Sequence, residues 1–170
     1  MSVVIGIDAD ARRLAYAVMR GGAFHVAKHI ERSSASNVRC GDYHRRLIEF
    51  MQAARKHNAV IYLEDIYLQF TPKKPGYTQH FSVTGFQALA EVQGEIKLEA
   101  NSCQVPIVLV KAVTWYSEIL GITRDRDKLK PASMKVAQRI ARRDLSQHEA
   151  DAVCLALYGT RREQSWGQVD

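Results

Sequence analysis

Short apolar runs rich in β-branched residues predict five strands along the chain. Runs of this kind, bounded by glycine, asparagine or charged residues, are typical of buried strands. The predicted strands are residues 3–9, 14–19, 23–30, 59–65 and 105–111. Gly21 and Gly22 separate the second run from the third, and a glycine pair in that place predicts a hairpin turn. The chain is therefore expected to open with a three-stranded antiparallel meander.

Apolar residues at helical spacing predict five helices. Leu47, Ile48, Met51 and Ala54, for example, recur at intervals that place them on one helix face. The predicted helices are residues 42–57, 82–103, 112–120, 132–144 and 146–157. The segment after the fourth strand holds two prolines and a glycine, and it is not predicted to form a regular element throughout.

The order of these elements predicts an α/β protein with a mixed five-stranded sheet. Three antiparallel strands are followed by alternating helices and strands, which places helices on both faces of the sheet. This is the arrangement of the RNase H-like fold. A chain of 170 residues can bury a full core, so we expect a single domain over residues 1–170.

The composition indicates a cytoplasmic protein without a membrane partner. Hydrophobic residues make up 46% of the chain and charged residues 25%, which is ordinary for a globular protein. No apolar run approaches the roughly 18 to 20 residues that span a bilayer, and the opening MSVVIGIDAD lacks the features of a signal peptide. The cysteines are scattered and odd in number, so reduced thiols are expected at Cys40, Cys103 and Cys154.

Positive charge is concentrated toward the C-terminal end. The formal net charge is +6, and residues 124–143 hold eight basic side chains against two acidic ones. A local block of this sign is typical of a surface that meets phosphate, and it is also compatible with a solvated helix face.

Three carboxylates fall at comparable places in the predicted fold. Asp8 ends the first strand, Glu64 ends the fourth, and Asp151 lies in the first turns of the last helix, one turn after His148. Each has a separate structural explanation, such as a turn or a helix cap, although Glu64 interrupts a buried strand and needs a partner. Clustered carboxylates are costly to ionise together unless a cation holds them. Together they predict a site for two Mg²⁺ or Mn²⁺ ions, in which the histidine is a ligand or orients water.

On these residues the chain resembles the RuvC-type Holliday-junction resolvases over nearly its whole length. The matching motifs are VVIGID, VIYLED, GFQALAEVQGEI, PIVLVK and HEADAVCLAL. The resemblance implies a homodimer that makes symmetric cuts in a four-way DNA junction and leaves 5′-phosphate nicks. It implies two Mg²⁺ ions per site, replaceable by Mn²⁺, and no small-molecule cofactor. The implied catalytic and metal-binding residues are Asp8, Glu64, His148 and Asp151.

The resemblance also implies residues that contact DNA. The family places an aromatic residue after the glutamate strand, where it stacks on unpaired bases at the junction centre. Tyr67 stands at that spacing, with Phe70 close behind, and packing within the loop is the alternative for both. The lysines expected to meet phosphates are Lys73, Lys74, Lys111, Lys128, Lys130 and Lys135.

The chain departs from the family pattern in two places. Most relatives follow the first aspartate with proline and glycine, whereas IDADARRLAY has no glycine before Gly21, so Asp10 or Arg12 could touch substrate. Trp115 stands where relatives often carry a basic residue, and the phosphate contact is expected at Lys111 or in the basic block instead.

Other functions share parts of this pattern. A related nuclease acting on RNA or on other branched DNA would have the same metal site, although the aromatic and basic loop favours the junction. A sugar-kinase or actin-like ATPase also begins with IGID, but it needs phosphate-binding glycine and threonine residues and two lobes. A non-catalytic junction-binding protein would carry unpaired carboxylates at a cost. The small-residue helix at 81–100 is a candidate for the dimer interface or for packing on the sheet.

Overall fold

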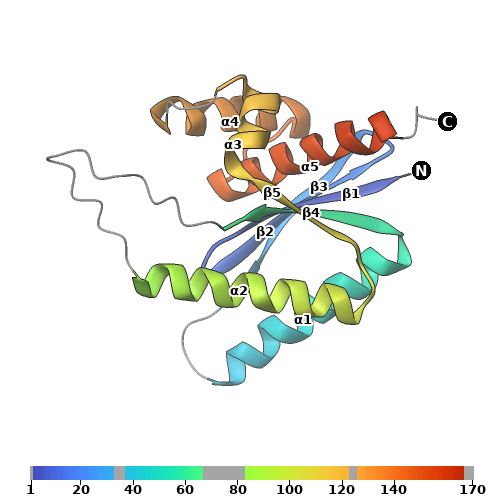
Figure 1. Ribbon diagram of the computed structural model, residues 1–170, viewed down its shortest axis with the longest axis vertical. Coiled ribbons are helices and arrows are strands. Elements are labelled where there is room, and N and C mark those ends of the chain that lie inside the picture. The colour runs from blue at the N-terminus through green and yellow to red at the C-terminus, as the bar shows by residue number, and fades with distance from the viewer. Residues whose placement is uncertain (1, 33–36, 67–82, 123–125, 167–170) are drawn as a thin grey trace, which may run out of the picture.

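The computed structural model describes residues 2–32, 37–66, 83–122 and 126–166. A five-stranded sheet lies between two layers of helices, with α1 and α2 on one face and α3, α4 and α5 on the other (Figure 1). This three-layer arrangement was expected from the order of strands and helices. None of the described helices combines the length and the hydrophobicity needed to cross a membrane.

The sheet has the mixed topology predicted from the sequence. Its strands are β1 (Val3–Ala9), β2 (Arg13–Arg20), β3 (Ala23–Glu31), β4 (Ala59–Asp65) and β5 (Ile107–Lys111). Their order is β3-β2-β1-β4-β5, with antiparallel pairing from β1 to β3 and parallel pairing of β1 with β4 and of β4 with β5. Parallel pairing of β1 and β4 brings their carboxyl ends to the same edge of the sheet.

Several helix boundaries differ from the predicted ones. The helices are α1 (Asn37–Lys56), α2 (Val83–Ser102), α3 (Ala112–Trp115), α4 (Arg126–Ala141) and α5 (Gln147–Trp166), with a π-helical turn, η1 (Tyr116–Leu120), after α3. The predicted start of α4 at residue 132 is wrong, because the helix includes Pro131 in its second turn. The predicted end of α5 at residue 157 is also wrong. Its last turns carry polar residues that are held by Glu118 and Tyr62, so the apolar spacing stops before the helix does.

A glycine in β1 sets how closely α5 lies on the sheet. A Cβ atom at Gly6 would lie 2.2 Å from the carbonyl oxygen of Ala152 and 2.3 Å from the nitrogen of Ala156. The bare backbone at Gly6 therefore allows direct contact between strand and helix, and Ala152 and Ala156 are completely buried there. This contact fixes the first turns of α5 beside the carboxyl end of β1.

The other face of the sheet has its own buried core. Leu47 and Met51 of α1 and Ile96 of α2 belong to one cluster with Ile7 of β1 and Leu63 of β4. All five side chains are completely buried. Ile7 and Leu63 immediately precede Asp8 and Glu64, the two carboxylates at the strand ends. The buried core therefore fixes the backbone position of both carboxylates.

The described cysteines agree with the expected reduced thiols. Cys103 and Cys154 are free, and Cys154 is buried. The side chain of Cys40 lies outside the part of the chain whose side chains are described.

Candidate active site

Two of the predicted carboxylates lie on adjacent strands at one sheet edge. In the parallel ladder, Ile7 of β1 pairs with Leu63 of β4, so Asp8 and Glu64 follow at matching positions. The side chain of Asp8 is 17% exposed, and Glu64 is also largely covered. The predicted convergence of the first and fourth strands is confirmed.

The first turn of α5 brings His148 to this edge. The ring atom Nδ1 of His148 lies 2.6 Å from Oδ2 of Asp8. This hydrogen bond raises the pKa of His148, while burial opposes the shift. The helix start is fixed by a capping box, in which Glu149 accepts from the Ser146 backbone N–H at 2.9 Å and Ser146 Oγ accepts from the Glu149 N–H at 3.3 Å.

The third carboxylate, Asp151, shares the same electrostatic environment. Burial raises the pKa of Glu64 to about 7, and the negative charges of Asp8 and Asp151 add to the shift, whereas a hydrogen bond from Trp115 opposes it. Burial also raises the pKa of Asp151, with a further contribution from Asp8. The three carboxylates therefore interact with one another in a region of low solvent access, as expected for neighbouring acids.

Neighbouring side chains hold two of these carboxylates in place. Trp115, which is completely buried, donates from Nε1 to Oε2 of Glu64 at 2.9 Å. Gln147 Nε2 lies 3.0 and 3.1 Å from the two carboxylate oxygens of Asp151. Gln93 of α2 donates to the backbone carbonyl of Glu64. A buried indole N–H needs an acceptor, and Trp115 finds one in Glu64. Where relatives often carry a basic residue, this chain thus has a side chain that binds a carboxylate and not DNA phosphate.

Comparison with known proteins gives a match at the level of structure. No family model and no curated protein matches the sequence. Thermus thermophilus RuvC superposes with a TM-score of 0.67 at 16% identity, over 96% of each chain. T. thermophilus RuvC in complex with Holliday junction substrate gives 0.66 at 14% identity, again over 96% of each chain. The chain has the RuvC fold. The predicted RNase H-like fold is thereby confirmed.

Asp10 occupies the turn in which the sequence departs from the RuvC family pattern. Its Oδ2 lies 3.2 Å from Nε2 of His148, on the opposite side of the ring from Asp8. Its Oδ1 accepts a hydrogen bond from the Arg12 backbone N–H at 2.6 Å. Asp10 therefore faces the candidate site, whereas the side chain of Arg12 is exposed.

The predicted DNA-contacting residues divide into two groups. Tyr67, Phe70, Lys73 and Lys74 lie outside the described residues. Lys111 ends β5 beside Asp65, next to the candidate site, and it is exposed. The other three, all exposed on α4, are Lys128, Lys130 and Lys135. Their contacts with phosphate stay a prediction.

The donor atoms do not form a closed metal site as they stand. Among the described residues, no three His, Cys, Asp or Glu side chains are close enough together to hold a metal ion. Asp8, Glu64 and Asp151 instead accept hydrogen bonds from His148, Trp115 and Gln147, respectively. Carboxylate oxygens, which three of the four side chains supply, are nevertheless the donors that suit Mg²⁺ or Mn²⁺. Burial is the main cause of the raised pKa of Glu64, and a cation among the three acids would offset both the burial of its charge and the repulsion from Asp8 and Asp151.

Three residues of this site were not predicted as site residues. Gln147 precedes Asp151 by four positions, so helical spacing alone could have indicated the contact. Trp115 and Gln93 lie 51 and 29 positions from Glu64, and no local pattern links either to it.

Proposed function

We propose that the protein is an endonuclease that cuts four-way DNA junctions by metal-dependent hydrolysis of phosphodiester bonds. The observation that carries this proposal is the gathering of four side chains from three elements at one edge of a sheet with the RuvC fold. They are Asp8, Glu64, His148 and Asp151. A protein of the same fold has been solved with a Holliday junction substrate, which supports the choice of DNA.

Mg²⁺, replaceable by Mn²⁺, is the proposed cofactor, with two ions per site. Asp8, Glu64 and Asp151 would supply hard carboxylate oxygens, and His148 a ring nitrogen. Bound ions would supply charge neutralisation for the attacking water and for the leaving 3′ oxygen of the DNA strand. Hydrolysis that breaks the bond between phosphorus and the 3′ oxygen leaves a 5′ phosphate and a 3′ hydroxyl at each nick.

The neighbouring side chains would keep the ligands oriented. Trp115 donates to one oxygen of Glu64 and so fixes the orientation of the carboxylate, whose other oxygen would bind the metal ion. Gln147 holds Asp151, and it is itself 2.8 Å from Ser133 Oγ of α4. Such outer contacts commonly change metal affinity or activity by about 10- to 100-fold when they are lost.

Basic residues around the site would bind the DNA arms. Lys111 lies at the carboxyl end of β5, at the same edge as the candidate site. The α4 lysines belong to the helical layer that also contains α5 (Figure 1). Phosphate contacts of this kind make affinity strongly dependent on salt. The segment after β4, with Tyr67, Phe70, Lys73 and Lys74, is proposed to contact the junction centre.

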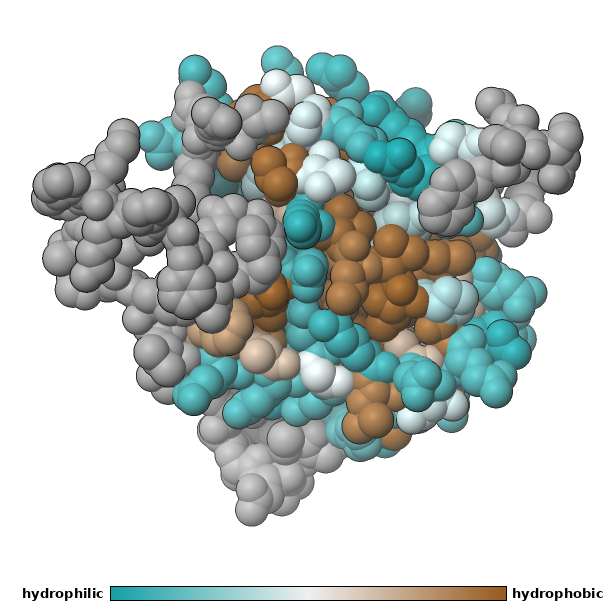
Figure 2. Space-filling view, viewed as in Figure 1, coloured by the Kyte–Doolittle hydropathy of each residue, from teal (hydrophilic) through white to brown (hydrophobic). Residues whose placement is uncertain are grey.

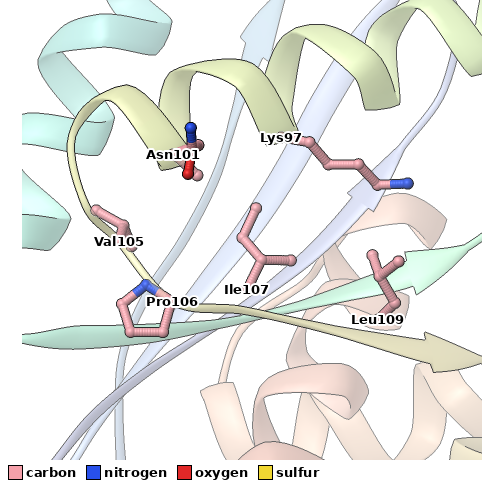
Figure 3. A pocket seen from close by; sticks show the side chains of 7 residues that line it. Lys97, Asn101, Val105, Pro106, Ile107 and Leu109 are labelled. Carbon is pink, nitrogen blue, oxygen red and sulfur yellow. The ribbon is translucent and has the colours of Figure 1, made fainter.

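A homodimer is proposed to supply the two symmetric cuts. Large hydrophobic side chains are exposed on helix α2, on edge strand β5 and on α3, which follows β5: Leu98 of α2 is 63% exposed, Leu109 of β5 45% and Val113 of α3 40%. Figure 2 shows hydrophobic side chains gathered on the face that carries β5. A groove of about 370 Å³ also lies between α2 and β5 (Figure 3), lined by Lys97, Ala100, Asn101, Val105, Pro106, Ile107 and Leu109. An exposed apolar surface beside an open strand edge is typical of a protein interface.

The test separates binding from cutting. Asp8→Asn removes one negative charge and little volume, so the variant should bind a labelled four-way junction about as well as the wild type. Its cutting in Mg²⁺ should fall by at least about 100-fold, since a ligand charge is lost. Asp42→Asn, which removes a charge from an exposed position on α1, is the matched control and should cut normally. Normal cutting by Asp8→Asn would contradict the proposal.

A further inference from the structure

His148 lies between two carboxylates that face different nitrogens of its ring. Nδ1 is 2.6 Å from Asp8 Oδ2, and Nε2 is 3.2 Å from Asp10 Oδ2. Asp8 belongs to the proposed ligand set, whereas Asp10 has no part in it. The ring is therefore bounded by the site on one side and by the turn between β1 and β2 on the other.

The turn holds Asp10 in a fixed orientation. The backbone N–H of Asp10 donates to the carbonyl of Arg13 at 2.9 Å, and the N–H of Arg12 donates to Asp10 Oδ1 at 2.6 Å. Arg13 Nε lies 3.5 Å from Oδ2, the oxygen that faces His148. One carboxylate oxygen thus serves the turn, and the other is directed at the histidine. This side-chain bond to the backbone two residues on forms an Asx turn, and no residue of the turn has the positive φ that would favour glycine.

Asp10 lies beside the ring nitrogen of His148 that does not contact Asp8. A neutral imidazole carries its proton on one nitrogen and binds a metal ion through the other. A carboxylate that accepts a hydrogen bond from the remote N–H fixes both the tautomer and the ring orientation. We propose that Asp10 is a positioning residue that accepts from Nε2–H of His148, so that Nδ1, the nitrogen that donates to Asp8, is the one that gives up its proton to bind the metal ion. This inference rests on the proposed metal site.

Asp10→Asn tests the inference with little change of shape. The amide oxygen of asparagine can still accept from the Arg12 N–H, which preserves the turn, and its NH₂ group would then face Nε2. This favours the opposite tautomer, with the proton on Nδ1. The affinity for Mn²⁺ alone, measured by paramagnetic resonance without DNA, should fall about 10- to 100-fold. The ¹⁵N shifts of His148 in the Mg²⁺-bound protein should show Nε2–H in the wild type and a loss of that form in the variant.

Two controls make the result specific. Asp144→Asn removes an exposed charge just before α5 and should leave Mn²⁺ affinity unchanged. Because Asp10 acts through the ring, Asp10→Asn should cause no further loss of Mn²⁺ affinity when it is added to His148→Ala. Asp10→Ser, whose hydroxyl can also accept from the Arg12 N–H, replaces Asp10→Asn if that variant does not fold.

The outcomes separate this inference from the proposed function. Mn²⁺ binding that depends on Asp8 but not on Asp10 would overturn the inference and leave the nuclease proposal standing. An equal loss from Asp10→Asn with and without His148 would also overturn it. If the wild type does not bind Mn²⁺, or if Asp8→Asn leaves that binding unchanged, the proposed metal site itself is wrong, and the role of Asp10 is wrong with it.

Discussion

Glu64→Gln should stabilise the metal-free protein at neutral pH. The folded protein raises the pKa of this carboxyl from 4.5 to about 7, first by burial and then by the charges of Asp8 and Asp151. A glutamine is neutral at every pH, and its amide oxygen can still accept the hydrogen bond from Trp115. The substitution therefore removes the cost of the buried charge and keeps the main contact.

The sign and size of the effect follow from proton linkage. The folded state holds the Glu64 proton more tightly than the unfolded chain, so this group's contribution to stability is largest at low pH. That contribution is lost as pH rises from about 4.5 to about 7. Each factor of ten in proton affinity corresponds to about 1.4 kcal/mol. The difference in free energy of unfolding between Glu64→Gln and wild type should therefore grow from near zero at acid pH to at most about 3 kcal/mol above pH 7.

Urea unfolding in chelator, repeated between pH 5 and pH 8, measures this difference. Glu49→Gln, at an exposed position on α1, is the matched control and should show no comparable change with pH. Added Mg²⁺ should reduce the difference in free energy of unfolding at pH 8. It binds strongly to the folded wild type alone and therefore stabilises the wild type more than the variant. A difference between Glu64→Gln and wild type that stays constant from pH 5 to pH 8 would refute the reasoning.

Three other substitutions test separate parts of the structure. Trp115→Phe should leave junction binding intact and lower cutting about 10-fold or more, because Glu64 loses its donor; unchanged cutting rates would show that the indole does not orient it. Gly6→Ala should lower the free energy of unfolding in urea by about 1–3 kcal/mol or more, since the new Cβ meets the Ala152 carbonyl, and wild-type stability would contradict the close packing of α5 on β1. Leu98→Glu should make the protein monomeric in sedimentation at concentrations where the wild type is dimeric, while an unchanged dimer would place the interface elsewhere.

The sheet could be predicted because its signals are local. Each strand is a short apolar run, and the glycine pair at residues 21 and 22 joins two of them in a hairpin. Once β1 and β4 are parallel neighbours, the adjacency of Asp8 and Glu64 follows from their equal places at the strand ends. The capping box of α5 is a local signal of the same kind, because Ser146 and Glu149 lie three positions apart.

The contacts that complete the site depend on distant parts of the chain. Trp115 reaches Glu64 across 51 positions, and Asp10 reaches His148 only because α5 returns to the carboxyl end of β1. The missing glycine after Asp8 indicates an unusual turn, but not the direction of the Asp10 side chain. The start of α4 was missed for another reason: proline normally disfavours a helix interior, and here the helix tolerates Pro131 in its second turn.

Cleavage of a labelled four-way junction, beside a linear duplex of the same sequence, tests the central claim most directly. The wild type is predicted to make paired symmetric nicks with 5′ phosphates in the junction when Mg²⁺ or Mn²⁺ is present. It should leave the linear duplex intact and do nothing in chelator. Equal cutting of both substrates would contradict selectivity for the junction, and tight junction binding without any metal-dependent cutting would contradict the nuclease assignment itself.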